Sequence, residues 1–249
     1  MDNSAYLVEV IAGLLYLPAA LHLLRLAART GQTPERLLGW AFACLGSSYL
    51  VYAAPIVLPL ENVWLIFALL GRAAVSTGCV LVALFTRRVF CAGRPWAGAA
   101  VWGCATLMVN GLLVGALTGD IEGFSIANPG FWIEWLGQVL PILWLTAEAF
   151  RQYRDARRRM RLGLAEPLLC NRFLLWGWFG VLQLGTWLCS LPMYFDYSQE
   201  GRFSAGMDLL VGGCEIVSLG MVWLAFTPPR LYRRWIESFD ASGSRTELA

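Results

Sequence analysis

Long apolar runs recur along the whole chain and are separated by short polar segments. Each run holds about 20 residues, and a helix of this length crosses the roughly 30 Å hydrocarbon core of a bilayer. The pattern therefore predicts an all-α, polytopic membrane protein with seven transmembrane helices in one domain, residues 1–228. The seven runs cover residues 5–28, 37–60, 63–86, 96–118, 131–152, 172–195 and 206–227.

The composition agrees with a membrane protein. Hydrophobic residues make up 58% of the chain and charged residues 14%, whereas a soluble domain carries about 25% charged residues. The N-terminal segment contains Asp2 and no basic residue. We therefore expect the first run to be a transmembrane helix rather than a cleaved signal peptide.

The arginines predict the orientation in the membrane. The chain has no lysine, so all 19 basic residues are arginines. Seventeen fall on one side of the predicted membrane, Arg202 falls on the other side, and Arg72 lies within the third run. Because basic residues gather on the cytoplasmic side, we expect an external N-terminus and a cytoplasmic C-terminus. The seventeen are Arg25, Arg29, Arg36, Arg87, Arg88, Arg94, Arg151, Arg154, Arg157, Arg158, Arg159, Arg161, Arg172, Arg230, Arg233, Arg234 and Arg245.

Two basic segments are expected on the cytoplasmic side. Helix five should continue beyond the bilayer through residues 151–167 and end near Gly163 and Pro167. Its arginines predict binding to anionic lipid headgroups or to a cytoplasmic protein partner. After Pro228 and Pro229, residues 229–249 predict a short amphipathic helix on the inner leaflet, followed by a disordered tail. The apolar face of that helix would hold Leu231, Tyr232, Trp235, Ile236 and Phe239.

Polar side chains from several runs fall at similar depths in the predicted membrane. Arg72 lies nine residues after Val63, which is about 13 Å along a helix, and Glu215 lies equally far after Gly206. Lipid cannot satisfy such groups, so they should face the interior of the bundle. The candidate ligand-binding or coupling residues are Arg72, Glu215, Glu134, Gln138, Asp208, Asn110 and Gln183, with Trp187 as a possible wall of an apolar pocket.

A charge near the bilayer centre needs a partner. An unpaired arginine there costs at least about 2.5–3.5 kcal/mol. Glu215 is the best-placed carboxylate and Glu134 the second, so we predict an Arg72–Glu215 ion pair. The pair would either form part of a ligand site or only fix helix packing.

Several chemistries are excluded or unsupported by the residues present. Seven helices with an external N-terminus are similar in topology to microbial rhodopsins, but without lysine no retinal Schiff base forms. His22, the single histidine, cannot supply a bis-histidine haem or a multi-histidine zinc site. The seven cysteines avoid the predicted outer loops, so no disulfide is expected. We expect no cofactor, no metal, no catalytic centre and no nucleic-acid partner.

Weak internal similarity suggests a repeat. Residues 69–86 and 210–227 share Leu, Gly, Phe and Thr at four equivalent positions, and runs one and two weakly echo runs five and six. The similarity predicts two parallel three-helix units joined by run four. Parallel repeats of this kind occur in transporters such as the SWEET sugar carriers, although the Pro-Gln pair of the related PQ-loop carriers is absent.

Three functions fit this pattern. The leading hypothesis is a sensor-like bundle that binds a small molecule in an outward-facing pocket and signals to a cytoplasmic or membrane partner. The second is a small secondary transporter with coupling carboxylates. The third is an accessory or assembly subunit of a membrane complex. The arginine-, alanine-, glycine- and leucine-rich composition suits a GC-rich bacterial gene, so we expect a bacterial inner membrane.

Overall fold

Seven long helices make up the described part of the protein. A computed structural model describes residues 4–57, 64–120, 125–200 and 205–236, and no strand occurs within these ranges. The prediction of an all-α fold is therefore confirmed. The helices are α1 (Ser4–Thr30), α2 (Thr33–Val57), α3 (Trp64–Phe90), α4 (Pro95–Leu117), α5 (Pro129–Arg161), α6 (Pro167–Glu200) and α7 (Ala205–Phe226).

Six of these helices, all except α5, are long and apolar enough to cross a membrane. This supports an integral, multi-pass membrane protein. The exception has a physical cause, because α5 carries the buried polar residues Glu134, Gln138 and Glu148 and ends in a run of arginines. The crossing by α5, and with it the seven-span topology, stays a prediction.

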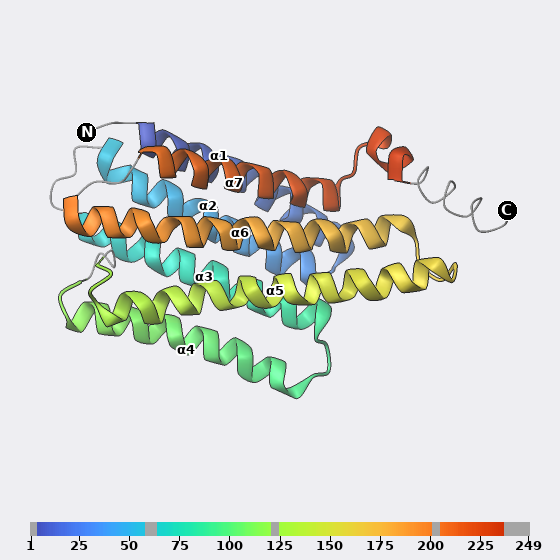
Figure 1. The fold of residues 1–249 in the computed structure, drawn as a ribbon, viewed down its shortest axis with the longest axis horizontal. Helices are drawn as coiled ribbons and strands as arrows, with labels where there is room; N and C mark the ends of the chain where they lie inside the picture. Colours follow the sequence, from blue (N-terminus) through green and yellow to red (C-terminus); the bar gives the residue numbers. More distant parts are fainter. Residues whose placement is uncertain (1–3, 58–63, 121–124, 201–204, 237–249) are drawn as a thin grey trace.

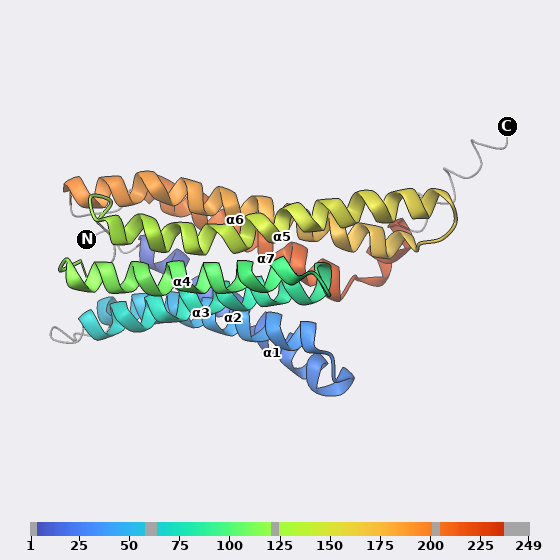
Figure 2. The same ribbon diagram turned by 90° about the horizontal axis from the view of Figure 1, so that it is seen from below.

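Successive helices run in opposite directions, so the odd-numbered connections share one end of the bundle (Figure 2). This is the end to which the sequence assigns the arginines. α5 and α6 extend beyond α3 and α4 there (Figure 1). α5 stops at Arg161, and Gly163 adopts a φ of 68°, a conformation that favours glycine. The helix end predicted near Gly163 is confirmed.

Close backbone contacts arrange six helices in a closed ring. α1 packs against α2 and α7, α3 against α2 and α5, and α6 against α5 and α7, while α4 lies outside against α3 and α5 (Figures 1 and 2). Two seams therefore join the triplets α1–α3 and α5–α7, namely α3–α5 and α7–α1. This order is the one expected of two parallel three-helix repeats, although the duplication itself stays a prediction.

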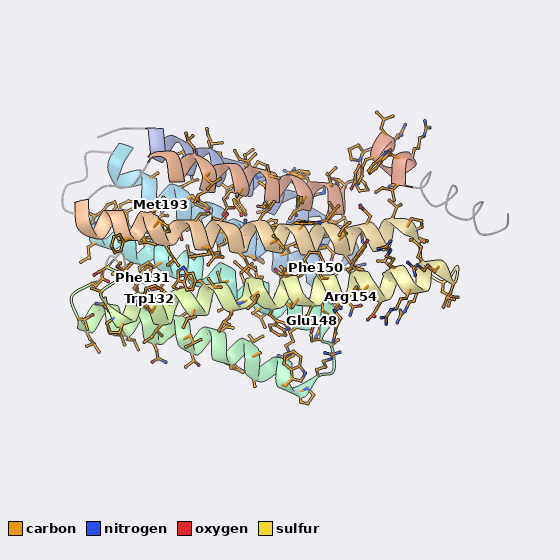
Figure 3. All side chains as sticks on the ribbon, viewed as in Figure 1. Phe131, Trp132, Glu148, Phe150, Arg154 and Met193 are labelled. Atoms are coloured by element: carbon orange, nitrogen blue, oxygen red, sulfur yellow. The ribbon has the colours of Figure 1, made fainter. Side chains whose placement is uncertain are left out.

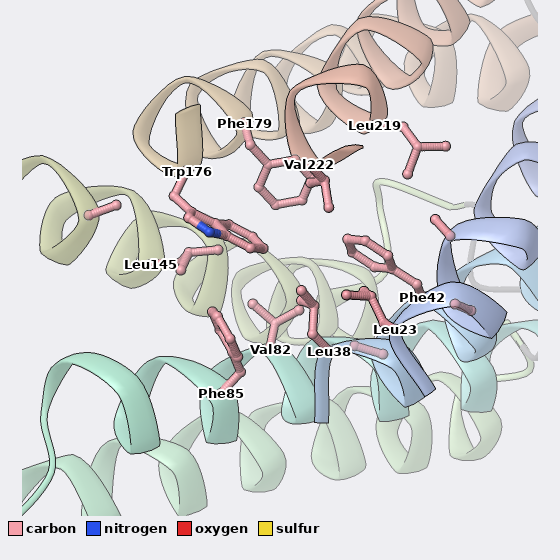
Figure 4. Packing of buried hydrophobic residues seen from close by; sticks show 14 of the residues in the cluster. Leu23, Leu38, Phe42, Val82, Phe85, Leu145, Trp176, Phe179, Leu219 and Val222 are labelled. Atoms are coloured by element: carbon pink, nitrogen blue, oxygen red, sulfur yellow. The ribbon is translucent and has the colours of Figure 1, made fainter. Parts of the chain in front are cut away.

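An apolar core fills the ring towards its arginine-rich end. All six ring helices contribute buried side chains to it, as Figure 4 shows. Phe85 lies 13 residues beyond Arg72 on α3, and Val222 lies seven residues beyond Glu215 on α7. On α7 the core begins at Leu219, four residues or about 6 Å beyond Glu215, and on α3 it begins at Val82, ten residues or about 15 Å beyond Arg72. Labelled members are Leu23, Leu38, Phe42, Val82, Phe85, Leu145, Trp176, Phe179, Leu219 and Val222.

Glycines allow α4 to approach α5 very closely. A Cβ atom built on Gly111 would lie 2.5–2.7 Å from the N, Cα and Cβ atoms of Glu134. One built on Gly130 would lie 2.6 Å from the backbone nitrogen of Gly115. Neither position has room for a side chain, so the α4–α5 contact fixes where the Glu134 backbone sits.

The chain after α7 folds back onto the bundle. Residues 230–236 are helical, and the Tyr232 hydroxyl exchanges hydrogen bonds with the Asn171 side chain at 3.1 and 3.3 Å. Ile236 is buried, whereas Leu231 and Trp235 are exposed. The predicted amphipathic helix thus divides its apolar side chains between the bundle and the surroundings. Phe239 lies outside the described residues.

Candidate functional site

Arg72 and Glu134 form a buried ion pair between α3 and α5. The Nε atom of Arg72 donates to Glu134 Oε2 at 3.0 Å, and Nη2 makes a second, shorter contact with the same oxygen. The two residues are 4% and 5% exposed. The guanidinium thus binds the carboxylate through two of its nitrogens, as a strong charge-assisted pair does.

Neighbouring groups form further hydrogen bonds with this pair. Gln138 Nε2 donates to Glu134 Oε1 at 3.1 Å, and the Ser76 hydroxyl lies 3.4 Å from the same oxygen. Arg72 Nη1 donates to the backbone carbonyl of Asp120 at 3.4 Å. We call Arg72, Ser76, Glu134 and Gln138 the arginine centre.

The predicted Arg72–Glu215 pair is wrong. Within the described residues α3 packs against α2, α4 and α5, whereas α7 packs only against α1 and α6. Equal depth therefore does not bring Arg72 and Glu215 together, because they lie on helices that do not touch. The second candidate named from the sequence, Glu134, is the partner.

Glu215 lies in a separate buried cluster at the other seam. Tyr16 Oη donates to Glu215 Oε2 at 2.5 Å, and Tyr49 Oη donates to Oε1 at 3.1 Å. Gln183 Nε2 donates to Oε2 at 2.8 Å and also lies 2.8 Å from the hydroxyl of Ser218. Four helices, α1, α2, α6 and α7, thus contribute to this glutamate centre.

The two centres differ in charge balance. Glu215 is 4% exposed, yet no arginine of the described residues lies within ion-pair distance of it. A buried carboxylate without a cation is costly, so this group must be compensated by its hydrogen bonds or carry a proton. The glutamate centre thus holds a buried carboxyl group without an arginine partner among the described residues, whereas the arginine centre holds a charge-balanced pair.

The remaining candidates are placed differently. Gln138 and Gln183 are buried members of the two centres, as the sequence predicts. Asn110 is exposed on α4, so the prediction that it faces the bundle interior is wrong; α4 is outside the ring, and only one of its faces is covered. Trp187 is half-buried on α6. The side chain of Asp208 lies outside the described residues.

Sequence reasoning missed both tyrosines of the glutamate centre. Tyr16 and Tyr49 lie in apolar runs one and two, where an aromatic ring fits without needing a polar partner. Their hydroxyls become informative only when α1 and α2 are placed beside α7. The sequence signal was slight, since each tyrosine is one polar atom in an apolar helix.

A third charged group marks the arginine-rich end. Glu148 forms ion pairs with Arg151 Nη2 at 2.6 Å and with Arg94 Nη1 at 3.8 Å. Cys91, in the α3–α4 turn, lies beside it. Burial and the hydrogen bond to Glu148 raise the pKa of the Cys91 thiol above its usual value, so the cysteine stays protonated at neutral pH. Figure 3 shows Glu148 and, further along α5, Arg154.

Removing the shortest hydrogen bond of the glutamate centre tests its importance. We expect Tyr16→Phe to lower the free energy of unfolding by about 1–2 kcal/mol, because Glu215 loses its donor at 2.5 Å. Tyr153→Phe is the matched control, since the Tyr153 hydroxyl makes no hydrogen bond to any described residue. Denaturant titration in detergent micelles measures both, and equal losses would argue against the assigned bond.

Comparison with protein-family models, with curated proteins and with solved structures gives no match.

Proposed function

We propose that this protein is a seven-span membrane sensor with an external N-terminus and a cytoplasmic C-terminus. In this proposal α5 also crosses the bilayer, which brings the number of spans to seven, and Glu134 and Gln138 face the interior of the ring. The clustering of arginines at one end of the bundle supports the orientation through the positive-inside rule.

One observation carries the sensor role, which is the length and continuity of α5. This single helix holds Glu134 at one end and the exposed Arg154, Arg157 and Arg158 near the other. From Glu134 to Arg161 there are 27 residues, or about 40 Å of helix. Pro141 lies within this helix, seven residues after Glu134, and an interior proline lacks the N–H of the helical hydrogen bond and permits a bend there. A displacement at the arginine centre would reach the cytoplasmic side through α5 as a shift of the helix or a pivot about Pro141.

The chemistry of the arginine centre indicates the ligand class. Arg72 binds one carboxylate, and a small molecule carrying a carboxylate or phosphate group would compete with Glu134 for the guanidinium. Displacing Glu134 would break the α3–α5 seam and free α5 to shift. The proposed signal is thus an exchange of the internal carboxylate for an external anion.

The test compares the two carboxylates. In lipid nanodiscs, Glu134→Gln removes the charge of the pair with little change in shape, and Glu215→Gln makes the same change in the other centre. We expect amide hydrogen exchange in residues 151–161 to change at least about threefold in Glu134→Gln and to stay unchanged in Glu215→Gln. Unchanged exchange in both variants would contradict transmission through α5.

A secondary transporter is the second candidate, and the ring order favours it. Carriers with parallel repeats move two similar units against each other around a central site, and here each seam between the triplets holds one carboxyl group. The test is uptake of radiolabelled amino acids and sugars into proteoliposomes. Uptake that Glu215→Gln abolishes supports a carrier and excludes a pure sensor. A stable larger complex that purifies with the protein and shows no uptake would instead support an accessory subunit.

A further inference from the structure

α4 is the helix that the ring leaves outside. It packs against α3 and α5 with one stripe of side chains, and the opposite face meets no other described helix (Figures 1 and 2). The buried stripe consists of Ala97, Val101, Cys104, Met108, Gly111 and Gly115. The outward face is broad, and includes Trp102 and Leu117, which are 73% and 86% exposed.

Asn110 is out of place on this outward face. It immediately precedes Gly111, which packs against Glu134, so it lies level with the arginine centre. It is seven residues, or about 10 Å, from the end of α4, which places it inside the hydrocarbon region. Its side chain is exposed and makes no hydrogen bond to any described residue. Lipid tails offer an amide neither donor nor acceptor.

The residues around Asn110 repeat with the spacing of a coiled coil. Starting at Trp96, successive steps of three and four residues reach only exposed positions through to Leu117. A strict alternation of this kind keeps one seam facing a partner helix at a shallow crossing angle. Ala99 and Gly103 are small, and a Cβ atom on Gly103 would meet nothing within 4 Å, so a second helix can approach closely there. The seam is Trp96, Ala99, Gly103, Thr106, Asn110, Leu113 and Leu117.

We propose that two copies of this chain pair along the α4 seam, with the two Asn110 side chains hydrogen-bonded to each other. A second copy fits because an amide carries both a donor and an acceptor and is therefore complementary to itself. Copies in one membrane share one orientation, so the two α4 helices run parallel and bring Asn110 opposite Asn110 at equal depth. A single polar residue at such a seam position also fixes the register of the pair. The contact is isologous, as two-fold symmetry requires.

The α4 dimer is independent of the sensor and carrier roles, and its test needs no ligand. Fluorescently labelled protein is diluted in liposomes, and single-molecule photobleaching gives the dimer fraction at each density. We expect dimers for the wild type and an apparent Kd at least about tenfold higher for Asn110→Leu. Asn110→Gln should retain the dimer because it keeps the amide. Val109→Ala, beside Asn110 but off the seam, is the matched control.

Oxidative crosslinking tests the orientation separately. The Leu117→Cys variant should form an intermolecular disulfide, whereas the Val114→Cys variant, changed on the half-buried side of α4, should not. Dimers that persist unchanged in Asn110→Leu, or a wild-type protein that is monomeric at every density, would overturn the proposal. So would a different protein that occupies the seam and is released by Asn110→Leu.

Discussion

Arg72→Leu is expected to lower the free energy of unfolding by about 3–5 kcal/mol. The substitution leaves the Glu134 carboxylate buried, 5% exposed, with the neutral donors Gln138 and Ser76 and without a cation. Glu134→Leu should lower the free energy of unfolding by a similar amount, because it removes the carboxylate that pairs with the buried Arg72 guanidinium. Unfolding in mixed micelles, followed by tryptophan fluorescence, measures each loss.

The double variants decide which carboxylate is the partner. Replacing both members of a buried ion pair by apolar residues is often close to neutral, so Arg72→Leu/Glu134→Leu should recover most of the stability lost by either single change. Arg72→Leu/Glu215→Leu should show the sum of its two single effects within about 0.5 kcal/mol. If stability were recovered in Arg72→Leu/Glu215→Leu and the losses were additive in Arg72→Leu/Glu134→Leu, Glu215 and not Glu134 would be the partner of Arg72.

The positions of the two centres give these energies a functional meaning. Each centre sits where the last helix of one triplet meets the first helix of the other, at α3–α5 and at α7–α1. Each seam holds one buried carboxyl group, and among the described residues only the one at α3–α5 is paired with an arginine. We therefore expect a change of charge at either carboxyl group to act first on its own seam.

The helices were predictable because their signals are local. An apolar run of about 20 residues is recognisable without knowledge of its neighbours, and the end of α5 follows from a glycine and a proline close in sequence. The α1–α7 bounds differ from the expected runs mainly where helices continue beyond the apolar part. α6, for example, begins at Pro167 rather than near residue 172.

The pairing of charges was not predictable because it depends on the order of helices in the ring. Counting residues along a helix gives depth, and depth alone made Glu215 the better partner for Arg72. The lateral neighbours of α3 are set by packing, above all by the α2–α3 and α3–α5 contacts. The predicted orientation of Asn110 was wrong for a related reason. α4 is largely apolar on every side, so its sequence does not show which face is covered.

Gly111→Ala is expected to lower the free energy of unfolding by about 3 kcal/mol. The new methyl group would lie 2.5–2.7 Å from backbone and Cβ atoms of Glu134, and backbone cannot rotate away as a flexible side chain does. α4 and α5 must separate, which moves Glu134 relative to Arg72. We therefore expect the interaction energy of the Arg72–Glu134 double-mutant cycle to fall when the cycle is repeated in the Gly111→Ala background.

Gly98→Ala is the matched control on the same helix. A Cβ atom there would lie 3.6 Å from the Arg87 guanidinium, an ordinary van der Waals contact, and alanine gains up to about 1 kcal/mol over glycine in a helix. The control should therefore be neutral or stabilising in the same unfolding assay. If Gly111→Ala behaved like Gly98→Ala, the α4–α5 contact would be looser than described. The position of Glu134 would then depend on its hydrogen bonds with Arg72, Gln138 and Ser76 and not on the close approach of α4.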